Sequence, residues 1–157
     1  ESFFWKFPTE EEIGKKKLYT TTWSYFENWD PYRNYIVARD HCGLKESNKG
    51  NDSTFTNFAQ TDQALYALHM YLCFLKFGFG RALQDAGIEI RRGSMNRDQA
   101  KNLVKMYDGQ FPEENLELYL DYYKMTLEEF QNVINFWANK DILKFEKGKW
   151  IPKFKIV

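Results

Sequence analysis

Apolar positions along most of the chain recur with the period of an α-helix. From residue 30 to residue 137, segments with apolar residues every three or four positions are separated by glycine, proline and capping residues, which is the pattern of successive amphipathic helices. The predicted helices begin at Pro31, Ala64 and Arg81, after the cap Asn96, at Pro112 and after the cap Thr126. We therefore expect a mainly α protein built as a multi-helix bundle.

Three shorter patterns lie outside these helices. Thr9 and the acids Glu10 to Glu12 predict a helix start, and Gly14 predicts its end. Leu18 to Phe26 is dense in β-branched and aromatic residues and predicts a short N-terminal strand. We expect the pairing partners of that strand in sequence outside this chain. Two apolar runs on either side of Gly148 predict a C-terminal β-hairpin.

The segment from Ala64 to Phe77 is the most apolar in the chain. Apolar residues surround it on nearly every side, so we expect this helix in the middle of the core, with Leu68 and Leu72 buried. It is too short, and interrupted by His69, to cross a bilayer. The core of the protein is therefore predicted around this helix.

Two of the helical segments are similar to each other. MNRDQAKNLVKMY, from Met95, and MTLEEFQNVINFW, from Met125, share capping, acidic and apolar positions with a period of 30 residues. Two copies cannot stack into a solenoid, so we interpret them as a duplicated helical unit. Thr126 to Phe154, a helix followed by a hairpin, also has the element order of a winged helix. Its acidic, aromatic helix favours a role in packing over DNA binding.

Composition narrows the class of protein. The 157 residues fit one domain or most of one, and 43% hydrophobic and 18% aromatic content exclude disorder. Lysine plus arginine and aspartate plus glutamate number 22 each, which disfavours nucleic acid and membrane as partners. The two cysteines lie far apart and no signal peptide precedes them, so we expect a reducing, cytoplasmic location. Because the chain opens at Glu1 rather than at methionine, we expect a fragment of a longer protein.

The stretch around residues 78–92 carries the most specific chemical pattern. Gly78 and Gly80 directly precede a helix that begins with Arg81, and a helix N-terminus with a flexible turn and an arginine can bind an anion. Arg81, Asp85, Glu89 and Arg92 then follow at spacings of four, four and three. The alternatives are a tight interhelical turn and a solvated face held by local ion pairs.

The loop from Gly43 to Gln60 has no apolar period, and a loop of that length in a compact domain is usually functional or mobile. A metal site is the remaining alternative. His69 and Cys73 stand four residues apart on one predicted helix, and His41 with Cys42 could complete a four-ligand set. We favour a buried cysteine in a core helix and predict no metal site.

Three segments together are similar to a known family: TTTWSYFENWDPYRNYIVARDHCGL, TFTNFAQTDQALYALHMYLCFLKFGFGRALQDAGIEIRRGSMNRDQAKNLVKMYDGQFP and YLDYYKMTLEEF. They resemble the C-terminal part of the bacterial N-acetyl sugar amidotransferases of lipopolysaccharide and other surface-polysaccharide biosynthesis. The resemblance covers residues 19–130 and is most specific over Lys76 to Ala100. It implies an enzyme that activates the acetamido carbonyl of a sugar nucleotide with ATP. Ammonia from a separate glutaminase subunit then gives an acetamidino group.

The same resemblance implies that the ATP-binding domain of the enzyme lies outside this chain. The family consists of PP-loop ATP pyrophosphatases, whose Ser-Gly-Gly-x-Asp-Ser loop holds the ATP phosphates, and this sequence has no such loop. We therefore expect residues 1–29 to be the tail of an upstream α/β ATP-binding domain and residues 30–157 to be a helical C-terminal domain. ATP and Mg²⁺ would be bound mainly by that upstream domain, and this chain alone would be inactive.

Within this chain the resemblance suggests binding roles and no catalytic residue. Lys76, Arg81 and Arg92 would contact anionic groups of ATP or the sugar nucleotide, with Asp85 orienting an arginine. Gly78 and Gly80 would form the phosphate turn, and residues 54–60, including Thr56 and Asn57, would form a mobile wall of the pocket. The rival hypothesis is a non-catalytic helical domain that binds a protein partner.

Overall fold

The computed structural model describes residues 7–16 and 19–156. The chain divides into two compact units, Glu1–Pro31 and Tyr32–Val157. The predicted origin of residues 1–29 in an upstream α/β domain stays a prediction. No helix in the described parts of the chain is both long enough and apolar enough to cross a membrane.

The first unit contains the helix α1 (Glu10–Lys16). Thr9 caps it, because the Glu12 amide donates to Thr9 Oγ1 over 3.3 Å and the Thr9 amide donates to Glu12 Oε2 over 2.9 Å. The predicted stop at Gly14 is wrong, since the helix continues to Lys16. Glycine weakens a helix without blocking it, and acids in the first turn with lysines in the last stabilise the helix dipole.

The predicted N-terminal strand is also wrong. Leu18 lies outside the described residues, residues 19–22 form no strand, and Trp23–Tyr25 forms the 3₁₀-helix η2. A strand needs a pairing partner, and within the described ranges only the C-terminal hairpin forms a sheet. Local contacts stabilise the turn instead: Trp23 Nε1 donates to Glu27 Oε2 over 3.1 Å, and the Trp23 ring lies 6.1 Å from that of Phe26.

From Pro31 onward the fold is mainly α with a C-terminal hairpin, as predicted. The helices are α2 (Pro31–Cys42), α3 (Ala64–Phe77), α4 (Arg81–Arg91), α5 (Arg97–Tyr107), η3 (Glu113–Asn115), α6 (Leu116–Tyr123) and α7 (Leu127–Trp137). The strands β1 (Leu143–Glu146) and β2 (Lys149–Pro152) pair antiparallel, with Glu146 opposite Lys149. Lys147 and Gly148, both at positive φ, form the two-residue turn between them.

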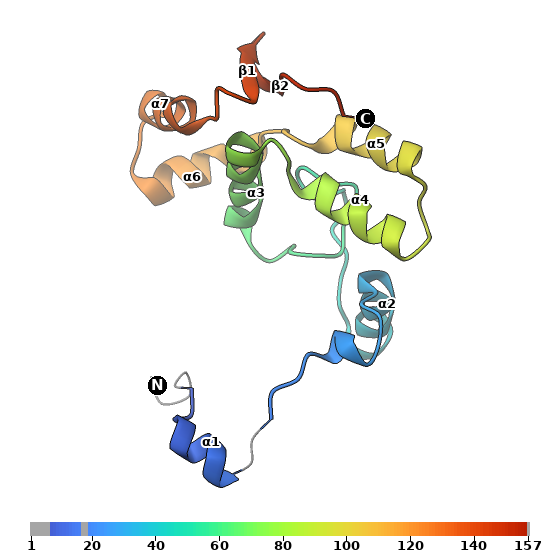
Figure 1. The fold of residues 1–157 in the computed structure, drawn as a ribbon. Coiled ribbons are helices and arrows are strands. Elements are labelled where there is room, and N and C mark those ends of the chain that lie inside the picture. The colour runs from blue at the N-terminus through green and yellow to red at the C-terminus, as the bar shows by residue number, and fades with distance from the viewer. Residues whose placement is uncertain (1–6, 17–18, 157) are drawn as a thin grey trace. The chain divides into compact units, whose positions relative to one another are not determined.

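Helix α3 lies between α6 and α4 (Figure 1) and contributes four residues to the larger cluster of core residues, Leu68, Tyr71, Phe74 and Leu75. Its Leu68, Tyr71 and Phe74 pack with residues of α6, α7 and the hairpin, including Tyr119, Phe130, Ile134, Leu143 and Trp150. The predicted burial of Leu68 is confirmed at 2% exposure, but that of Leu72 is wrong at 39%. Neighbouring elements cover only part of the helix circumference, so an all-round apolar sequence does not give all-round burial.

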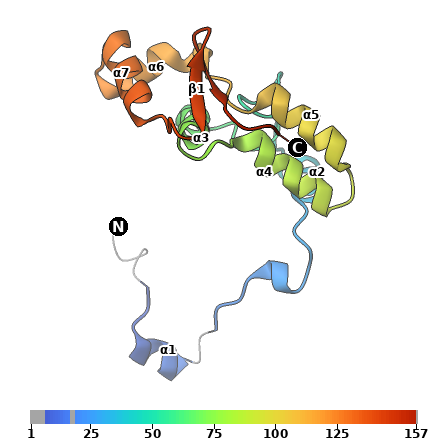
Figure 2. The ribbon, with the colours of Figure 1, turned by 45° about the horizontal axis from the view of Figure 1, so that its top comes forward.

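A second core cluster joins α4 to α5, which lie side by side in both views (Figures 1 and 2). Ala86 of α4 meets Ala100 and Val104 of α5, and Ile156 of the C-terminal tail packs against them. Helices α5 and α7 each begin with a capping box and bury equivalent positions, Ala100 with Val104 and Phe130 with Ile134. The similarity between the two segments thus extends to their caps and buried faces.

Candidate functional site

The charged stripe of α4 faces protein rather than solvent. Arg81 is only 4% exposed, and the side chains of Asp85, Glu89 and Arg92 are 19–21% exposed. The alternative of a solvated face held by local ion pairs is correct for the ion pairs, Arg81 with Asp85 and Arg92 with Glu89, and wrong for the solvation. The reason is tertiary, because the α2–α3 loop (residues 43–63) and two tyrosines contact this side of the helix.

Arg81 is held by three different contacts. Its Nη2 donates to the Ala59 carbonyl over 2.9 Å, and its Nε lies 3.5 Å from Asp85 Oδ2. The guanidinium also lies over the Tyr66 ring, 4.9 Å from the centroid. Asp85 contacts Arg81, and its role in orienting an arginine toward a ligand stays a prediction. Arg81 therefore links α4 to the α2–α3 loop and to α3.

Asp85 gathers donors from the same loop. Thr54 Oγ1 donates to Asp85 Oδ2 over 2.5 Å, and Thr56 Oγ1 donates to it over 3.3 Å. Thr54 is fully buried, so its hydroxyl needs this acceptor. One carboxylate oxygen thus joins two loop threonines to Arg81.

A carboxylate of the chain itself occupies the predicted anion site at the start of α4. Asp108 Oδ2 accepts from the Gly80 amide over 2.9 Å. Asp108 Oδ1 accepts from the amides of Ala82, over 2.9 Å, and Leu83, over 3.4 Å. A Cβ atom on Gly80 would lie 3.0 Å from Asp108 Oδ1, so glycine permits this close approach. The amides of this turn thus bind an internal carboxylate, and the binding of a ligand phosphate at Gly78 and Gly80 stays a prediction.

Burial dominates the electrostatics of Asp108. It raises the pKa of this carboxyl above its ordinary value, and the amides of Gly80, Leu83 and Ala82 offset part of the rise. The negative charge of nearby Asp85 raises the pKa further. The α4 start and the Asp85 network are therefore electrostatically coupled.

The other predicted site residues do not converge on this network. Arg92, at the end of α4, pairs with Glu89 over 2.7 Å and lies over the Tyr32 ring. Lys76 is exposed, with its amine over the Phe77 ring. Gly78 ends α3 and faces Ile142 and Phe154. Ligand binding by any of these residues stays a prediction.

The α2–α3 loop is extensively hydrogen-bonded. Ser53 Oγ donates to the Gln110 carbonyl over 2.8 Å, and Asn51 Nδ2 donates to the Ala59 carbonyl over 2.5 Å. Asn57 Nδ2 donates to the Ser47 carbonyl over 3.2 Å, so its side chain closes the loop on itself. These bonds hold the segment against α4 and the α5–α6 connection. A role as a wall of a ligand pocket stays a prediction.

Sequence reasoning missed Asp108, the central residue of the α4 start. Asp108 follows the last residue of α5, where an acid is unfavourable for the helix dipole. An acid in such a position signals a tertiary partner, but the sequence alone does not name that partner. Tyr66 was likewise treated only as part of an apolar helix, although its ring receives Arg81.

No group of three metal-ligating side chains among the described residues could hold a metal ion. Cys42 and Cys73 are both free thiols, the first exposed and the second partly buried. The sequence prediction favoured no metal ligation for these residues.

These features define an α-helical domain with a C-terminal hairpin and a polar network buried between a loop and a helix. A model of the family described as LPS biosynthesis protein WbpG-like, C-terminal domain, matches residues 52–155. The chain belongs to this family and thus to lipopolysaccharide biosynthesis. A search of curated proteins gave no match. The matched range contains Arg81, Asp85 and Asp108 together with their loop partners.

Proposed function

We propose that this chain is the helical C-terminal domain of an ATP-dependent N-acetyl sugar amidotransferase. The observation that carries the proposal is the family match over residues 52–155. In the proposed reaction, ATP adenylates the acetamido oxygen of a sugar nucleotide and releases pyrophosphate. Ammonia from a glutaminase subunit then adds to the carbon, and AMP leaves with the former amide oxygen. The product is an acetamidino group.

The geometry supports a positioning role for this domain in that enzyme. Arg81 and Asp85 are occupied in holding the α2–α3 loop on α4. Lys76 is exposed, and its amine lies over the Phe77 ring and forms no ion pair with a carboxylate among the described residues. We assign Lys76 the contact with an anionic group of the substrate or ATP. An upstream PP-loop domain would bind ATP and Mg²⁺, and the reaction would take place in the cytoplasm.

The test uses the full-length protein that contains this chain. It is supplied with ATP, Mg²⁺, an ammonium salt in place of glutaminase, and a panel of N-acetylated sugar nucleotides. We expect amidino product by mass spectrometry, no pyrophosphate release by this chain alone, and a loss of about tenfold or more in product rate for Lys76→Ala. Lys45→Ala, at an exposed lysine of the α2–α3 loop, is the matched control and should retain the wild-type rate.

Failure of the full-length protein to amidate any sugar of the panel would contradict the proposal. Pyrophosphate release above background by this chain alone would contradict its dependence on an upstream domain. Equal product rates for Lys76→Ala and Lys45→Ala would show that Lys76 does not contact the ligand. The proposed reaction would still stand.

A second function, the binding of a protein partner, is favoured by the surface of α6 and α7. Phe136 and Trp137 are 70% and 72% exposed, and Leu118 and Tyr122 are 50% and 63% exposed. The rings of Phe136 and Trp137 lie 5.2 Å apart, and exposed apolar side chains that lie together often mark interaction surfaces. The two functions are compatible, because the proposed enzyme needs a glutaminase subunit.

A further inference from the structure

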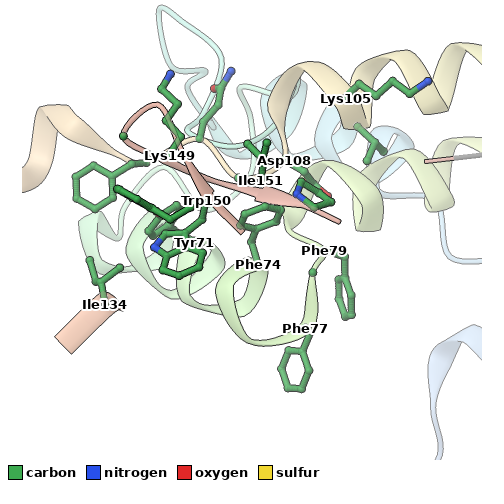
Figure 3. Close-up of a pocket in the computed structure, with 18 of the residues that line it drawn as sticks. Tyr71, Phe74, Phe77, Phe79, Lys105, Asp108, Ile134, Lys149, Trp150 and Ile151 are labelled. Carbon is green, nitrogen blue, oxygen red and sulfur yellow. The ribbon is translucent and has the colours of Figure 1, made fainter. Parts of the chain in front are cut away.

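Three exposed phenylalanine rings gather around Gly78, at the turn between α3 and α4. Phe77, Phe79 and Phe154 are 51%, 37% and 46% exposed. The rings of Phe77 and Phe79 stack with their centroids 5.9 Å apart, and both extend away from the buried Tyr71 (Figure 3). A Cβ atom on Gly78 would lie 3.1 Å from Cε1 of Phe154, so the third ring packs on the backbone between the other two. These three rings form one exposed aromatic cluster.

Lysines lie beside this aromatic cluster. The amide of Asn139 donates to the Leu75 carbonyl over 2.9 Å, which fixes the chain after α7 against the end of α3. Lys140 follows directly, and its carbonyl accepts a hydrogen bond from the amine of Lys153. Lys153 and Lys155 are the sequence neighbours of the third phenylalanine on either side. All three lysines are exposed, and none forms an ion pair with a carboxylate of the described residues.

The positive charge of this region is local. From Lys140 to Lys155 the chain has six lysines against two acids, Asp141 and Glu146, and Glu146 is already paired with Lys144. The whole sequence has 22 basic and 22 acidic residues, so its zero net charge conceals this cationic segment. Exposed rings beside unpaired lysines fit a partner that is both apolar and anionic.

We propose that the aromatic cluster and its lysines dock on the surface of an anionic lipid bilayer. The rings enter the boundary between headgroups and acyl chains, and the lysines attract the anionic headgroups. The abundance of lysine disfavours a protein partner, because protein interfaces are depleted in lysine. Single-stranded nucleic acid needs free ring faces for base stacking, whereas the Phe77 ring has the Lys76 amine over it and stacks on Phe79. The inference does not depend on the proposed amidation.

The test is cosedimentation of the full-length protein that contains this chain with vesicles of phosphatidylcholine, prepared with and without phosphatidylglycerol. We expect binding to the anionic vesicles alone, and weaker binding as added salt screens the lysines. Polyuridylate, added as a competitor, should not displace the protein from the vesicles. Failure to bind the anionic vesicles, equal binding to the neutral ones, or displacement by polyuridylate would overturn the proposal.

Variants locate the contact with the bilayer. Phe77→Ala should weaken vesicle binding by about fivefold or more, because it removes apolar area that the bilayer would bury. Lys155→Glu should weaken it by about tenfold or more, because it reverses a charge near the anionic surface. The matched controls are Phe26→Ala, at a ring that is 66% exposed in the first unit, and Lys45→Glu, at an exposed lysine of the α2–α3 loop. Both controls should bind like wild type, and wild-type binding by both cluster variants would overturn the assignment.

Discussion

Gly109 fills a position where a side chain would collide with the core. Its φ is +80°, and a Cβ atom there would lie 2.6 Å from Cζ of the buried Phe74 ring. Gly93 has a similar φ of +77° but no atom within 4 Å of the same position. Comparing substitutions at the two glycines therefore distinguishes the cost of positive φ from the cost of a clash with Phe74.

Gly109→Ala should lower the free energy of unfolding by about 3 kcal/mol or more, through strain at positive φ and displacement of Phe74. Gly93→Ala carries only the backbone strain and should lower it by about 1 kcal/mol. Urea denaturation of the two variants measures the difference. Similar losses in both would show that the Phe74 contact does not restrain the fold.

The sequence predicted which charged residues of α4 pair with each other, but it did not predict the distant residues that contact them. It identified Arg81 and Asp85 and their spacing, because an i, i+4 pair is local. It did not identify Thr54 as the partner of Asp85, because a contact between residues 31 positions apart depends on the tertiary fold. It also assigned Leu72 to the core, although which side of an apolar helix is covered is decided by distant elements.

At the scale of elements, α4 begins against a carboxylate instead of a capping side chain. Its N-cap residue, Gly80, has no side chain, and Asp108 accepts from three amides of the first turn. Asp108→Ala should therefore lower the free energy of unfolding by about 1–3 kcal/mol, as buried amides lose their acceptor. Asp62→Ala, at an exposed aspartate before α3, should change it by less than about 0.5 kcal/mol.

The advantage of wild type over Asp108→Ala should also depend on pH. Burial raises the folded-state pKa of Asp108 above its ordinary value of 3.8, so the folded state holds this proton more tightly than the unfolded state. The advantage should be largest at and below about pH 4 and fall as pH rises through the raised pKa. Urea midpoints of both proteins across this range measure it. An advantage that grows with pH would show that the amides outweigh burial.

The sequence correctly predicted the helix starts and the hairpin turn, because both depend on residues that are close together in the chain. The caps predicted at Asn96 and Thr126 and the hairpin predicted around Gly148 are present. The strand predicted at Leu18 to Phe26 is absent from its described part, because β-propensity without a pairing strand does not form a sheet. Element types were thus predictable where their stabilising contacts lie within a few residues.

At the scale of the whole molecule, buried polar contacts hold the α2–α3 loop of the larger unit against helix α4. Arg81, Asp85 and Thr54 form the centre of that junction. The charged stripe of α4 is therefore internal architecture, which supports the surface that binds the ligand. Arg91 offers a matched comparison, because it has the same side chain on the same helix but is exposed.

The most direct measurement is the free energy of unfolding, by urea denaturation, of wild type, Arg81→Ala and Arg91→Ala. Arg81→Ala should lose about 2–4 kcal/mol, since it leaves the partly buried Asp85 without its cation and removes one of the two donors to the Ala59 carbonyl. Arg91→Ala should stay within about 0.5 kcal/mol of wild type. Equal stability of the two variants would contradict the account and return Arg81 to the ligand-binding role expected from the sequence.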